Sequence, residues 1–267
     1  MEAGTLSTSR TSARVHAGVR AGVVAAAPLV AITALGAVLR LWAFARVGPN
    51  PFYDAAVRSM SLSWSNFFFG AFEPGAQVSI DKAPADLWVQ VASVKLFGFS
   101  GVATRAPEVA AGILAIPLLY DLVRRLFGRR AGLGAAAALA VLPMAILTAH
   151  SDTMDSVMML LDVLAAWLVV VGAQSRRAWP VVAAGAVLGV AFNVKLFEAL
   201  IFAPALALLM LLAFDVPWRR RVLAVGASLA AFVAVSLSWI VAASLTPLSA
   251  RPWPIGSTNG SIWNVIF

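Results

Sequence analysis

Long apolar runs, separated by short polar or basic stretches, dominate the chain. A helix needs about 20 apolar residues to cross roughly 30 Å of hydrocarbon. Seven runs approach that length, and they cover residues 21–39, 107–123, 131–148, 156–173, 178–192, 199–214 and 222–245. The pattern predicts an all-α integral membrane protein with about seven transmembrane helices.

Composition strengthens this prediction, because 61% of the residues are hydrophobic, 12% are charged and the mean hydropathy is +0.88. A soluble domain carries about 25% charged residues. The chain contains no cysteine, which excludes disulfides, thiolate metal sites and a catalytic thiol. Its two histidines leave little for a histidine-based zinc site.

Basic residues predict how the helices are oriented. The positive-inside rule holds at every turn if the N-terminus is cytoplasmic. The cytoplasmic turns then contain Arg124, Arg125, Arg129, Arg130, Arg176, Arg177, Arg219, Arg220 and Arg221. Residues 1–20 become a cytoplasmic polar tail. The net charge of +8 is therefore explained by topology, and we expect no nucleic-acid partner. High alanine and arginine usage is typical of a GC-rich bacterium, so the expected location is a bacterial plasma membrane.

The outer side receives a long loop, residues 46–106, within a transmembrane module that spans residues 21–245. Helical periodicity separates polar from apolar positions in residues 54–65 and again in residues 86–94. Both stretches are expected to be interfacial helices with an apolar face in lipid. Pro74 and Gly75 indicate a loop between them. Residues 246–267 form a final outer segment.

The long loop carries the first candidate residues. Asp54 follows Pro49, Asn50 and Pro51, and it suits either a chemical role or a helix cap. Asp81 and Lys82 form an adjacent pair that is either a solvated pair of little energetic value or part of a site. The cations Lys82, Arg58 and Arg105 are suited to hold the phosphate of an anionic lipid head group.

Two further clusters lie at the predicted outer helix ends. Asp152 and Asp155 flank a short turn, where Asp155 either caps the following helix or has a chemical role. Asn193 and Lys195 lie near Glu198 at another helix end, and a local Lys195–Glu198 pair is the simpler interpretation. Asp162 lies about 10 Å deeper than Asp155 on the same helix face, where a carboxylate is costly.

Carboxylates and cations on one side of a membrane suit group transfer from a lipid-borne donor. A carboxylate accepts the proton of an acceptor hydroxyl, and cations stabilise a departing phosphate. A transporter or flippase is the second hypothesis. It predicts inverted repeats and polar residues at midplane, whereas here Asp162 is the main polar residue at depth. A non-catalytic subunit that binds a carrier lipid is the third.

Five stretches of the sequence carry a family resemblance. They are NPFYDAAVRSMSLSWSNFFFGAFEPGAQVSIDKAPADLWVQVASVKLFGFS, TRAPEVAAGILAIPLLYDLVRRLFGRRAG, SDTMD, GVAFNVKLFEAL and SARPWPIGSTNGS. The combination resembles bacterial membrane glycosyltransferases of the protein O-mannosyltransferase and aminoarabinose-transferase-like superfamily, and most of all its branch with a DKPPLGFWVQ-type motif. The resemblance implies the C-type glycosyltransferase fold and a polyprenyl-phosphate sugar donor used on the outer face.

The resemblance also implies roles for individual residues. Asp54 matches the acidic position that serves as catalytic base, and Lys82 matches the lysine that contacts the carrier phosphate. Asp155 matches a second acidic motif beside the active site, and Arg105 matches the arginine that opens the second span. Asp152, Asn193 and Lys195 are the expected substrate-binding residues, and Arg58 is expected to assist Lys82.

This chain departs from the family pattern in ways that leave alternatives open. Ala55 follows Asp54 where relatives have an acidic pair, so Asp81 or Asp152 is an alternative base. Ala83 replaces the first proline of the KPP motif. Members of the superfamily have more spans than this chain, so it corresponds to an N-terminal module, and a complementary chain is an expected partner. No cofactor is required, although Asp54 with Asp155 is compatible with a divalent cation.

Overall fold

The computed structural model describes residues 26–42, 44–46, 48 and 50–266. The expected polar tail at residues 1–20 lies outside the described residues, as do the first five residues of the first apolar run. After a first helix within the candidate span Ala26–Arg46, the elements are η1 (Phe44–Arg46), α2 (Pro51–Met60), α3 (Trp64–Phe69), β1 (Val78–Ser79), α4 (Ala85–Phe97), α5 (Gly101–Val141), α6 (Pro143–Ala149), α7 (Asp155–Ser175), α8 (Ala178–Lys195), η2 (Leu196–Leu200), α9 (Ala203–Ala213), α10 (Trp218–Ser244), η3 (Leu248–Ala250), β2 (Trp253–Pro254) and α11 (Trp263–Ile266).

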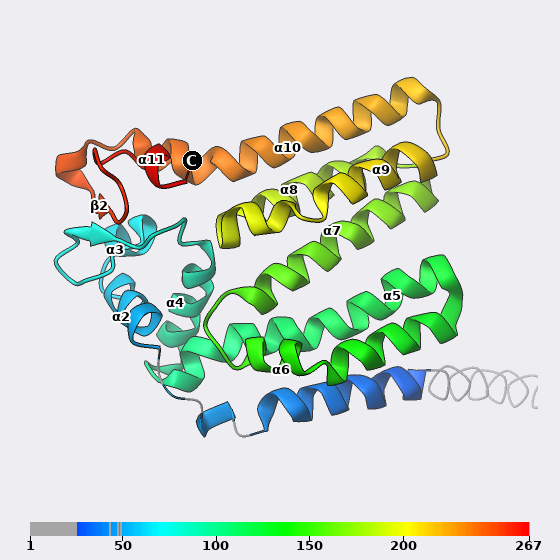
Figure 1. Cartoon of the computed structure of the whole chain (residues 1–267), viewed down its shortest axis with the longest axis horizontal. Helices are drawn as coiled ribbons and strands as arrows, with labels where there is room; N and C mark the ends of the chain where they lie inside the picture. The colour runs from blue at the N-terminus through cyan, green and yellow to red at the C-terminus, as the bar shows by residue number, and fades with distance from the viewer. Residues whose placement is uncertain (1–25, 43, 47, 49, 267) are drawn as a thin grey trace, which may run out of the picture.

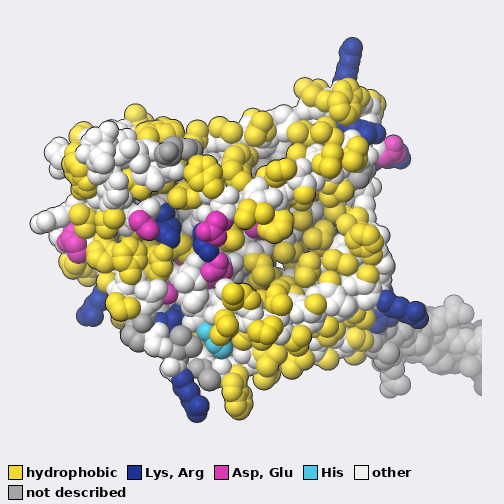
Figure 2. Space-filling view, viewed as in Figure 1, with side chains coloured by type: hydrophobic (Ala, Val, Ile, Leu, Met, Phe, Trp, Pro, Cys, Tyr) yellow, Lys and Arg dark blue, Asp and Glu magenta, His cyan; other side chains and the backbone are white. Residues whose placement is uncertain are grey.

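Long helices lie side by side and alternate in direction (Figure 1). Five of those described are long and apolar enough to cross a membrane: Ala26–Arg46, Gly101–Val141, Asp155–Ser175, Ala178–Leu200 and Trp218–Ser244. Much of the surface seen in Figure 2 is hydrophobic, as expected for helices that face lipid. The all-α membrane class predicted from the sequence is therefore confirmed.

The structure groups the apolar runs differently from the seven predicted helices. The runs at 107–123 and 131–148 both fall largely in α5, which reverses direction at Gly128 (Figure 1). Gly128 has a φ of 83°, a region that favours glycine. The two arms pack closely, since a Cβ on Gly132 would lie 2.8 Å from the backbone oxygen of Tyr120. The run at 199–214 contains the 11-residue helix α9, which reaches about 16 Å. The count of seven spans stays a prediction.

Every turn predicted to be cytoplasmic lies at one end of this bundle. The α5 reversal, the α7–α8 turn and the start of α10 are together at the right of Figure 1. The elements α2, α3, α4, β1 and β2 lie at the opposite end. The helix order therefore agrees with the alternation that the basic residues predicted.

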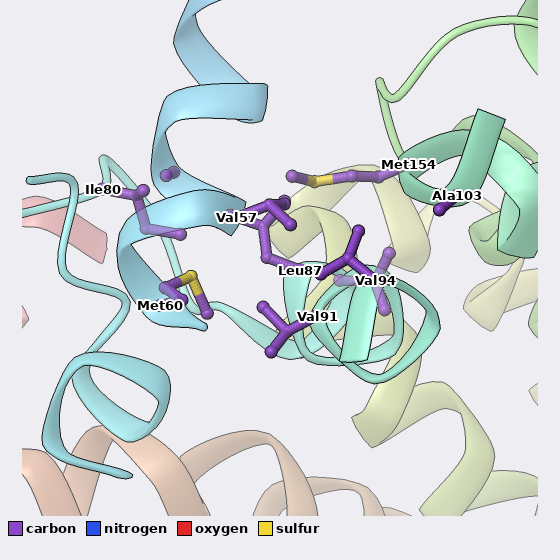
Figure 3. Packing of buried hydrophobic residues seen from close by; sticks show 10 residues of the cluster. Val57, Met60, Ile80, Leu87, Val91, Val94, Ala103 and Met154 are labelled. Carbon is purple, nitrogen blue, oxygen red and sulfur yellow. The ribbon is translucent and has the colours of Figure 1, made fainter. Parts of the chain in front are cut away.

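Two interfacial helices with apolar faces in lipid were expected in the long outer loop. The expectation that these faces contact lipid is wrong. The first stretch is broken into α2 and α3, and α2 turns Val57 and Met60 into a protein core with Leu87 and Val91 of α4 (Figure 3). On α4 the polar side chains are also buried, Asp86 among them. The period grouped these side chains correctly, but protein rather than lipid covers most of the apolar ones, while Trp64 is 84% exposed.

The final outer segment folds back onto the first outer loop. Strand β2 pairs in parallel with β1, with Val78 opposite Trp253. Ile262 and Ile266 pack in a buried cluster with Ala83. Residues 246–266 thereby cover the backbone immediately next to Lys82.

A buried arginine fastens the first helix to α5. Arg40 is fully buried, and its Nη1 and Nη2 atoms donate to the backbone oxygens of Ala140 (3.1 Å) and Leu139 (3.0 Å). In an uninterrupted helix the Leu139 oxygen would accept from residue 143, but Pro143 has no N–H. Arg40 supplies the donor that the proline lacks.

Candidate functional site

Asp54 and Arg105 form the centre of a polar cluster at the outer end of the bundle. Arg105 Nη2 lies 3.8 Å from Asp54 Oδ2, and the Arg105 side chain is 3% exposed. The guanidinium is held in place by the backbone oxygens of Gly48 (2.6 Å) and Gly101 (3.0 Å). Asp54 Oδ1 has no hydrogen-bond donor among the described residues. A carboxylate with a free oxygen is thus held beside a fixed cation.

The position of Asp54 depends on the residue that caps α2. Asn50 is the N-cap, because its Oδ1 accepts from the backbone N–H of Phe52 at 3.1 Å. The capping role considered for Asp54 is therefore wrong, although its place in the first helical turn still favours a negative charge. Asn50 Nδ2 also donates to Asp152 Oδ1 at 2.9 Å, so one side chain starts α2 and fastens the 151–154 turn to it.

Asp152 is almost completely buried and lies close enough to Asp54 for their charges to interact. Burial raises the pKa of Asp152, and the charge of Asp54 acts in the same direction, while the hydrogen bond from Asn50 and the charge of Arg105 oppose the increase. Its Oδ2 atom has no hydrogen-bond donor among the described residues. Asp152 is therefore a further carboxyl of the cluster that is closed to solvent.

Lys82 lies against the residue that precedes Asp54. Its Nζ atom donates to the Tyr53 hydroxyl at 2.6 Å and lies 5.0 Å from the centre of the Tyr53 ring. The adjacent Asp81 is half exposed, and its carboxylate is 3.9 Å from Lys82 Nζ. The interpretation of Asp81 and Lys82 as a solvated pair fits Asp81 but not Lys82, whose side chain is 16% exposed.

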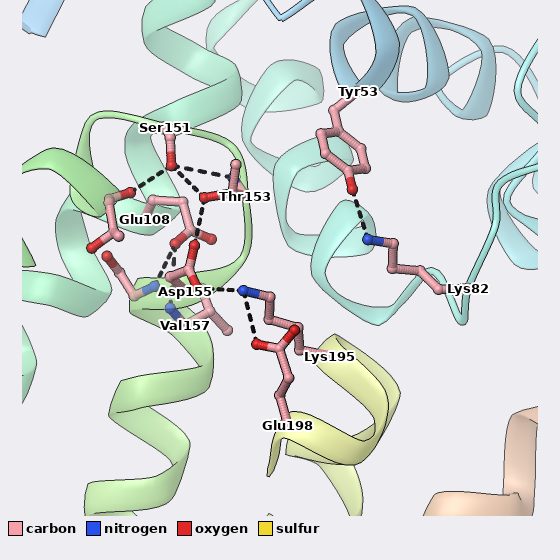
Figure 4. A network of polar contacts seen from close by, with 11 residues as sticks. Tyr53, Lys82, Glu108, Ser151, Thr153, Asp155, Val157, Lys195 and Glu198 are labelled. Atoms are coloured by element: carbon pink, nitrogen blue, oxygen red, sulfur yellow. Dashed lines mark hydrogen bonds and ion pairs between the residues drawn. The ribbon is translucent and has the colours of Figure 1, made fainter. Parts of the chain in front are cut away.

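A second polar group lies beside the first and joins α7 to the end of α8 (Figure 4). Lys195 Nζ contacts Asp155 Oδ1 and lies 3.1 Å from Glu198 Oε2. Thr153 Oγ1 donates to Asp155 Oδ2 at 2.6 Å. The expected local pair of Lys195 and Glu198 is present, but Lys195 also binds the acidic residue that the family resemblance places at the active site.

Three of the predicted site residues contact neither the Asp54–Arg105 pair nor the Asp155–Lys195 pair. Arg58 is exposed and lies over the ring of Phe99, 5.5 Å from its centre. Asn193 donates to the backbone oxygens of Gly189 and Val235, both at 3.0 Å, so it joins α8 to α10. The third, Asp81, contacts only Lys82 among the described charged groups. Helical periodicity gave the face of Arg58 but not its neighbours.

Sequence reasoning missed the roles of Asp86 and Glu108. Both are completely buried. Burial raises the pKa of Asp86 to about 6, with the charge of Asp152 adding to the increase and Lys82 opposing it. Glu108 Oε2 accepts from the backbone N–H groups of Ser156 (3.0 Å) and Val157 (3.3 Å), at the start of α7 (Figure 4). The signal in the sequence was a carboxylate inside an apolar run.

The geometry does not assemble the cation site that was considered. Asp54 pairs with Arg105, whereas Asp155 pairs with Lys195. Within the part of the chain that the structure describes, no group of three or more His, Cys, Asp or Glu side chains is arranged to hold a metal ion. A divalent cation stays a prediction.

An apolar cavity of about 390 Å³ opens next to the cluster, between α3, α4, α8 and α10. Its lining includes the aromatic side chains of Phe68, Trp88 and Trp239 together with Ala85. Ala85 follows Lys82 by three residues, so a residue that lines the cavity lies close in the chain to the one that carries the ammonium group. Such a volume accommodates part of an alkyl or prenyl chain.

Comparisons with known proteins agree on one family. A family model described as dolichyl-phosphate-mannose-protein mannosyltransferase matches residues 81–239. Two proteins of Bacillus subtilis (strain 168), each provisionally named a mannosyltransferase, are similar to the chain over 218 residues, or 82% of it. YkcB is 32% identical and YycA is 31% identical.

A solved structure gives the same result. ArnT from Cupriavidus metallidurans, in its apo state, is 25% identical and superposes with a TM-score of 0.63 over 81% of this chain and 41% of its own. The matched regions amount to 30% of YkcB and 32% of YycA. The chain thus spans about a third of the length of these curated relatives.

Proposed function

The chain belongs to the dolichyl-phosphate-mannose-protein mannosyltransferase family, and from this premise we propose that it is a membrane glycosyltransferase module. Its donor is a sugar linked to a polyprenyl phosphate, and its acceptor lies on the outer face of a bacterial plasma membrane. The observation that carries the proposal is the contact of Asp54 with Arg105 at one end of the bundle, next to Tyr53, which binds Lys82. Arg105 contacts Asp54 directly, and Lys82 is linked to it through the adjacent Tyr53.

The proposed reaction uses these groups as a base and as phosphate ligands. Asp54 accepts the proton of an acceptor hydroxyl, whose oxygen forms a bond to the anomeric carbon of the sugar. The bond between that carbon and the phosphate oxygen breaks, and the electron pair leaves with the carrier phosphate. Lys82 and Arg105 stabilise the departing phosphate. Attack from the face opposite the phosphate inverts the anomeric configuration.

Asp54 is preferred to the two alternative bases on the basis of its surroundings. Asp81 is half exposed and contacts only Lys82 among the described charged groups. Asp152 is almost completely buried, and its Oδ1 accepts from Asn50. Asp54 is 13% exposed at its side chain and keeps an oxygen without a donor among the described residues. Because Oδ1 itself is buried, the exposed part of the side chain lies elsewhere, and through it Asp54 is more accessible to an acceptor than Asp152.

Two features support a lipid-borne donor and an outer location. The aromatic cavity is lined by Ala85, three residues after Lys82 in the chain, so a prenyl chain in the cavity with its phosphate directed toward this residue would approach the ammonium group. The basic turns lie at the other end of the bundle (Figure 1). The positive-inside rule then assigns the Asp54 end to the outer face. Near that end, Figure 2 shows carboxylates and cations side by side in a mostly hydrophobic surface.

The test uses the purified chain in lipid nanodiscs with labelled mannose, glucose and arabinose on a polyprenyl phosphate carrier. Sugar release or transfer from one donor supports the proposal. Lys82→Ala should weaken both donor binding and transfer, while Lys95→Ala, an exposed lysine on α4, should leave both unchanged. Equal behaviour of the two variants would contradict the phosphate role of Lys82.

The same experiment separates the enzyme from a unit that binds the donor without turnover. Donor binding that depends on Lys82, with no transfer of any of the three sugars, would support the donor-binding hypothesis. If the chain showed neither donor binding nor sugar transfer, the assignment of the donor class would be overturned.

A further inference from the structure

Two buried carboxyl groups meet beneath the proposed active site. Asp86 lies in the first turn of α4 and Glu108 in the second turn of α5, and neither is exposed. The two side chains are close enough for one to donate a hydrogen bond to the other if either carries a proton. Two carboxylates in contact cannot both be ionised in a site without water, because the repulsion and the loss of hydration are too costly.

The hydrogen-bond partners show where a proton is needed. Asp86 Oδ2 accepts from Gln90 Nε2 at 2.5 Å, and Glu108 Oε2 accepts from the start of α7. The other oxygen of each group, Asp86 Oδ1 and Glu108 Oε1, has no donor among the described residues. Buried polar atoms are almost always hydrogen-bonded. A proton held by one carboxyl can be donated to the other, and it supplies a hydrogen bond that the site otherwise lacks.

We infer that Asp86 and Glu108 share one proton and that this protonated pair positions the residues of the proposed active site. The shared proton follows from the contact, the burial and the missing donors. The positioning role rests on the proposed function. It makes Asp86 and Glu108 positioning residues rather than catalytic ones, because neither reaches the surface.

The pair joins the three segments that bring the site together. Asp86 is four residues after Lys82, and Glu108 is three residues after Arg105 on the same helix. Through Ser156 and Val157, Glu108 also holds the start of α7, directly after Asp155. If the pair lost its proton, the repulsion would act between α4, which follows Lys82 in the chain, and α5, which carries Arg105.

The charged groups around the pair are few. Asp152 faces Asp86 from the 151–154 turn, and Lys82 faces it from the first outer loop. The negative charge of Asp152 raises the pKa of Asp86, as burial does, and Lys82 lowers it. At neutral pH this environment favours retention of a single proton by the pair.

Infrared spectroscopy of the chain in nanodiscs, without donor, tests the shared proton. The carbonyl stretch of a protonated carboxyl is compared at neutral pH in the wild type, Asp86→Asn and Glu108→Gln. In either variant the amide donates to the remaining carboxylate, so each single substitution should remove the whole band of the pair. Asp162→Asn, which replaces another buried carboxyl on α7, should leave that band in place.

Persistence of the band in either single variant would show that the carboxyls titrate independently, and its absence from the wild type would exclude the shared proton. Both results would overturn the inference. Because no donor is present, this measurement stands even if the chain transfers no sugar.

The positioning role has its own measurement. Hydrogen exchange at the amides of residues 151–158 should increase in Asp86→Ala and stay near the wild-type rate in Asp86→Asn, which keeps a hydrogen bond to Glu108. Sugar transfer should fall at least about tenfold in Asp86→Ala and stay within about threefold in Asp86→Asn. Unchanged exchange in Asp86→Ala would show that the pair does not hold these segments. If exchange increased but transfer stayed at the wild-type rate, the link to the reaction would be wrong.

Discussion

The ammonium group of Lys82 donates a hydrogen bond of 2.6 Å to the hydroxyl of Tyr53, the residue next to Asp54. This contact joins the first outer loop to α2 and places a proposed phosphate ligand near the proposed base. The ring of Tyr53 also lies beneath the ammonium group, 5.0 Å from its centre. The aromatic side chain therefore orients Lys82 by two separate interactions.

The first prediction concerns the Tyr53 hydroxyl. Tyr53→Phe keeps the ring but removes the hydrogen bond to a charged group, which is typically worth about 2 kcal/mol. We expect sugar transfer to fall by roughly tenfold, with the folded state retained. Tyr120→Phe, on α5, is the matched control and should transfer at the wild-type rate. Equal rates for the two variants would show that Tyr53 does not orient Lys82.

The second prediction concerns the buried Arg40. Replacement by alanine leaves the Leu139 and Ala140 oxygens without the side-chain donors that they have in the structure. We expect the free energy of unfolding to fall by about 3 kcal/mol, measured by thermal or chemical unfolding in detergent. Arg177→Ala, at an exposed position, should change it little. A stable Arg40→Ala protein would mean that these oxygens find other donors.

The third prediction concerns the contact between α8 and α10. A Cβ on Gly185 would lie 2.0 Å from the backbone oxygen of Ser228, whereas a Cβ on Gly226 of α10 would meet no atom within 4 Å. Gly185→Ala should therefore destabilise the protein by about 2 kcal/mol or more. Gly226→Ala should be neutral or slightly stabilising, because alanine favours the helix. The paired melting temperatures check this directly, and a reversed order would contradict the helix packing.

The fourth prediction follows from the pKa of Asp86, which burial raises from 3.8 to about 6. A carboxyl with a raised pKa stabilises the folded state when protonated. Its contribution is complete below pH 4 and is lost as the pH rises through about 6, where the pair passes from two protons to the single proton inferred above. The unfolding free energy of the wild type should therefore fall across this range relative to Asp86→Asn. Parallel pH curves for the two proteins would contradict the assignment.

Much of the fold could be predicted from the hydrophobic pattern. Each apolar run is at least partly helical in the structure, and the basic turns lie at one end. The reversal at Gly128 was anticipated as the boundary between two runs. What the pattern could not give was the covering of α2 and α4 by protein, because an apolar face looks the same whether it meets lipid or a neighbouring helix.

The candidate site could be predicted only in part, because the sequence pattern does not show which side chains become neighbours in the fold. Asp54 contacts Arg105, and Lys82 binds Tyr53, the neighbour of Asp54, although these residues lie far apart along the chain; their roles stay predictions. Arg58 was included as an outer-side cation suited to hold a phosphate, but its side chain is exposed and lies over the ring of Phe99. The pairing of Asp86 with Glu108 depends on how α4 meets α5, and that contact is tertiary rather than periodic.

The most direct test of the central claim is the rate of sugar transfer by Asp54→Asn in nanodiscs, measured together with its donor binding. The matched control is Asp215→Asn, an exposed carboxylate that pairs with Arg176 near the start of α10. If Asp54 is the base, turnover falls at least about a hundredfold, donor binding persists, and the control is unaffected. Turnover by Asp54→Asn at the wild-type rate would contradict the proposed mechanism.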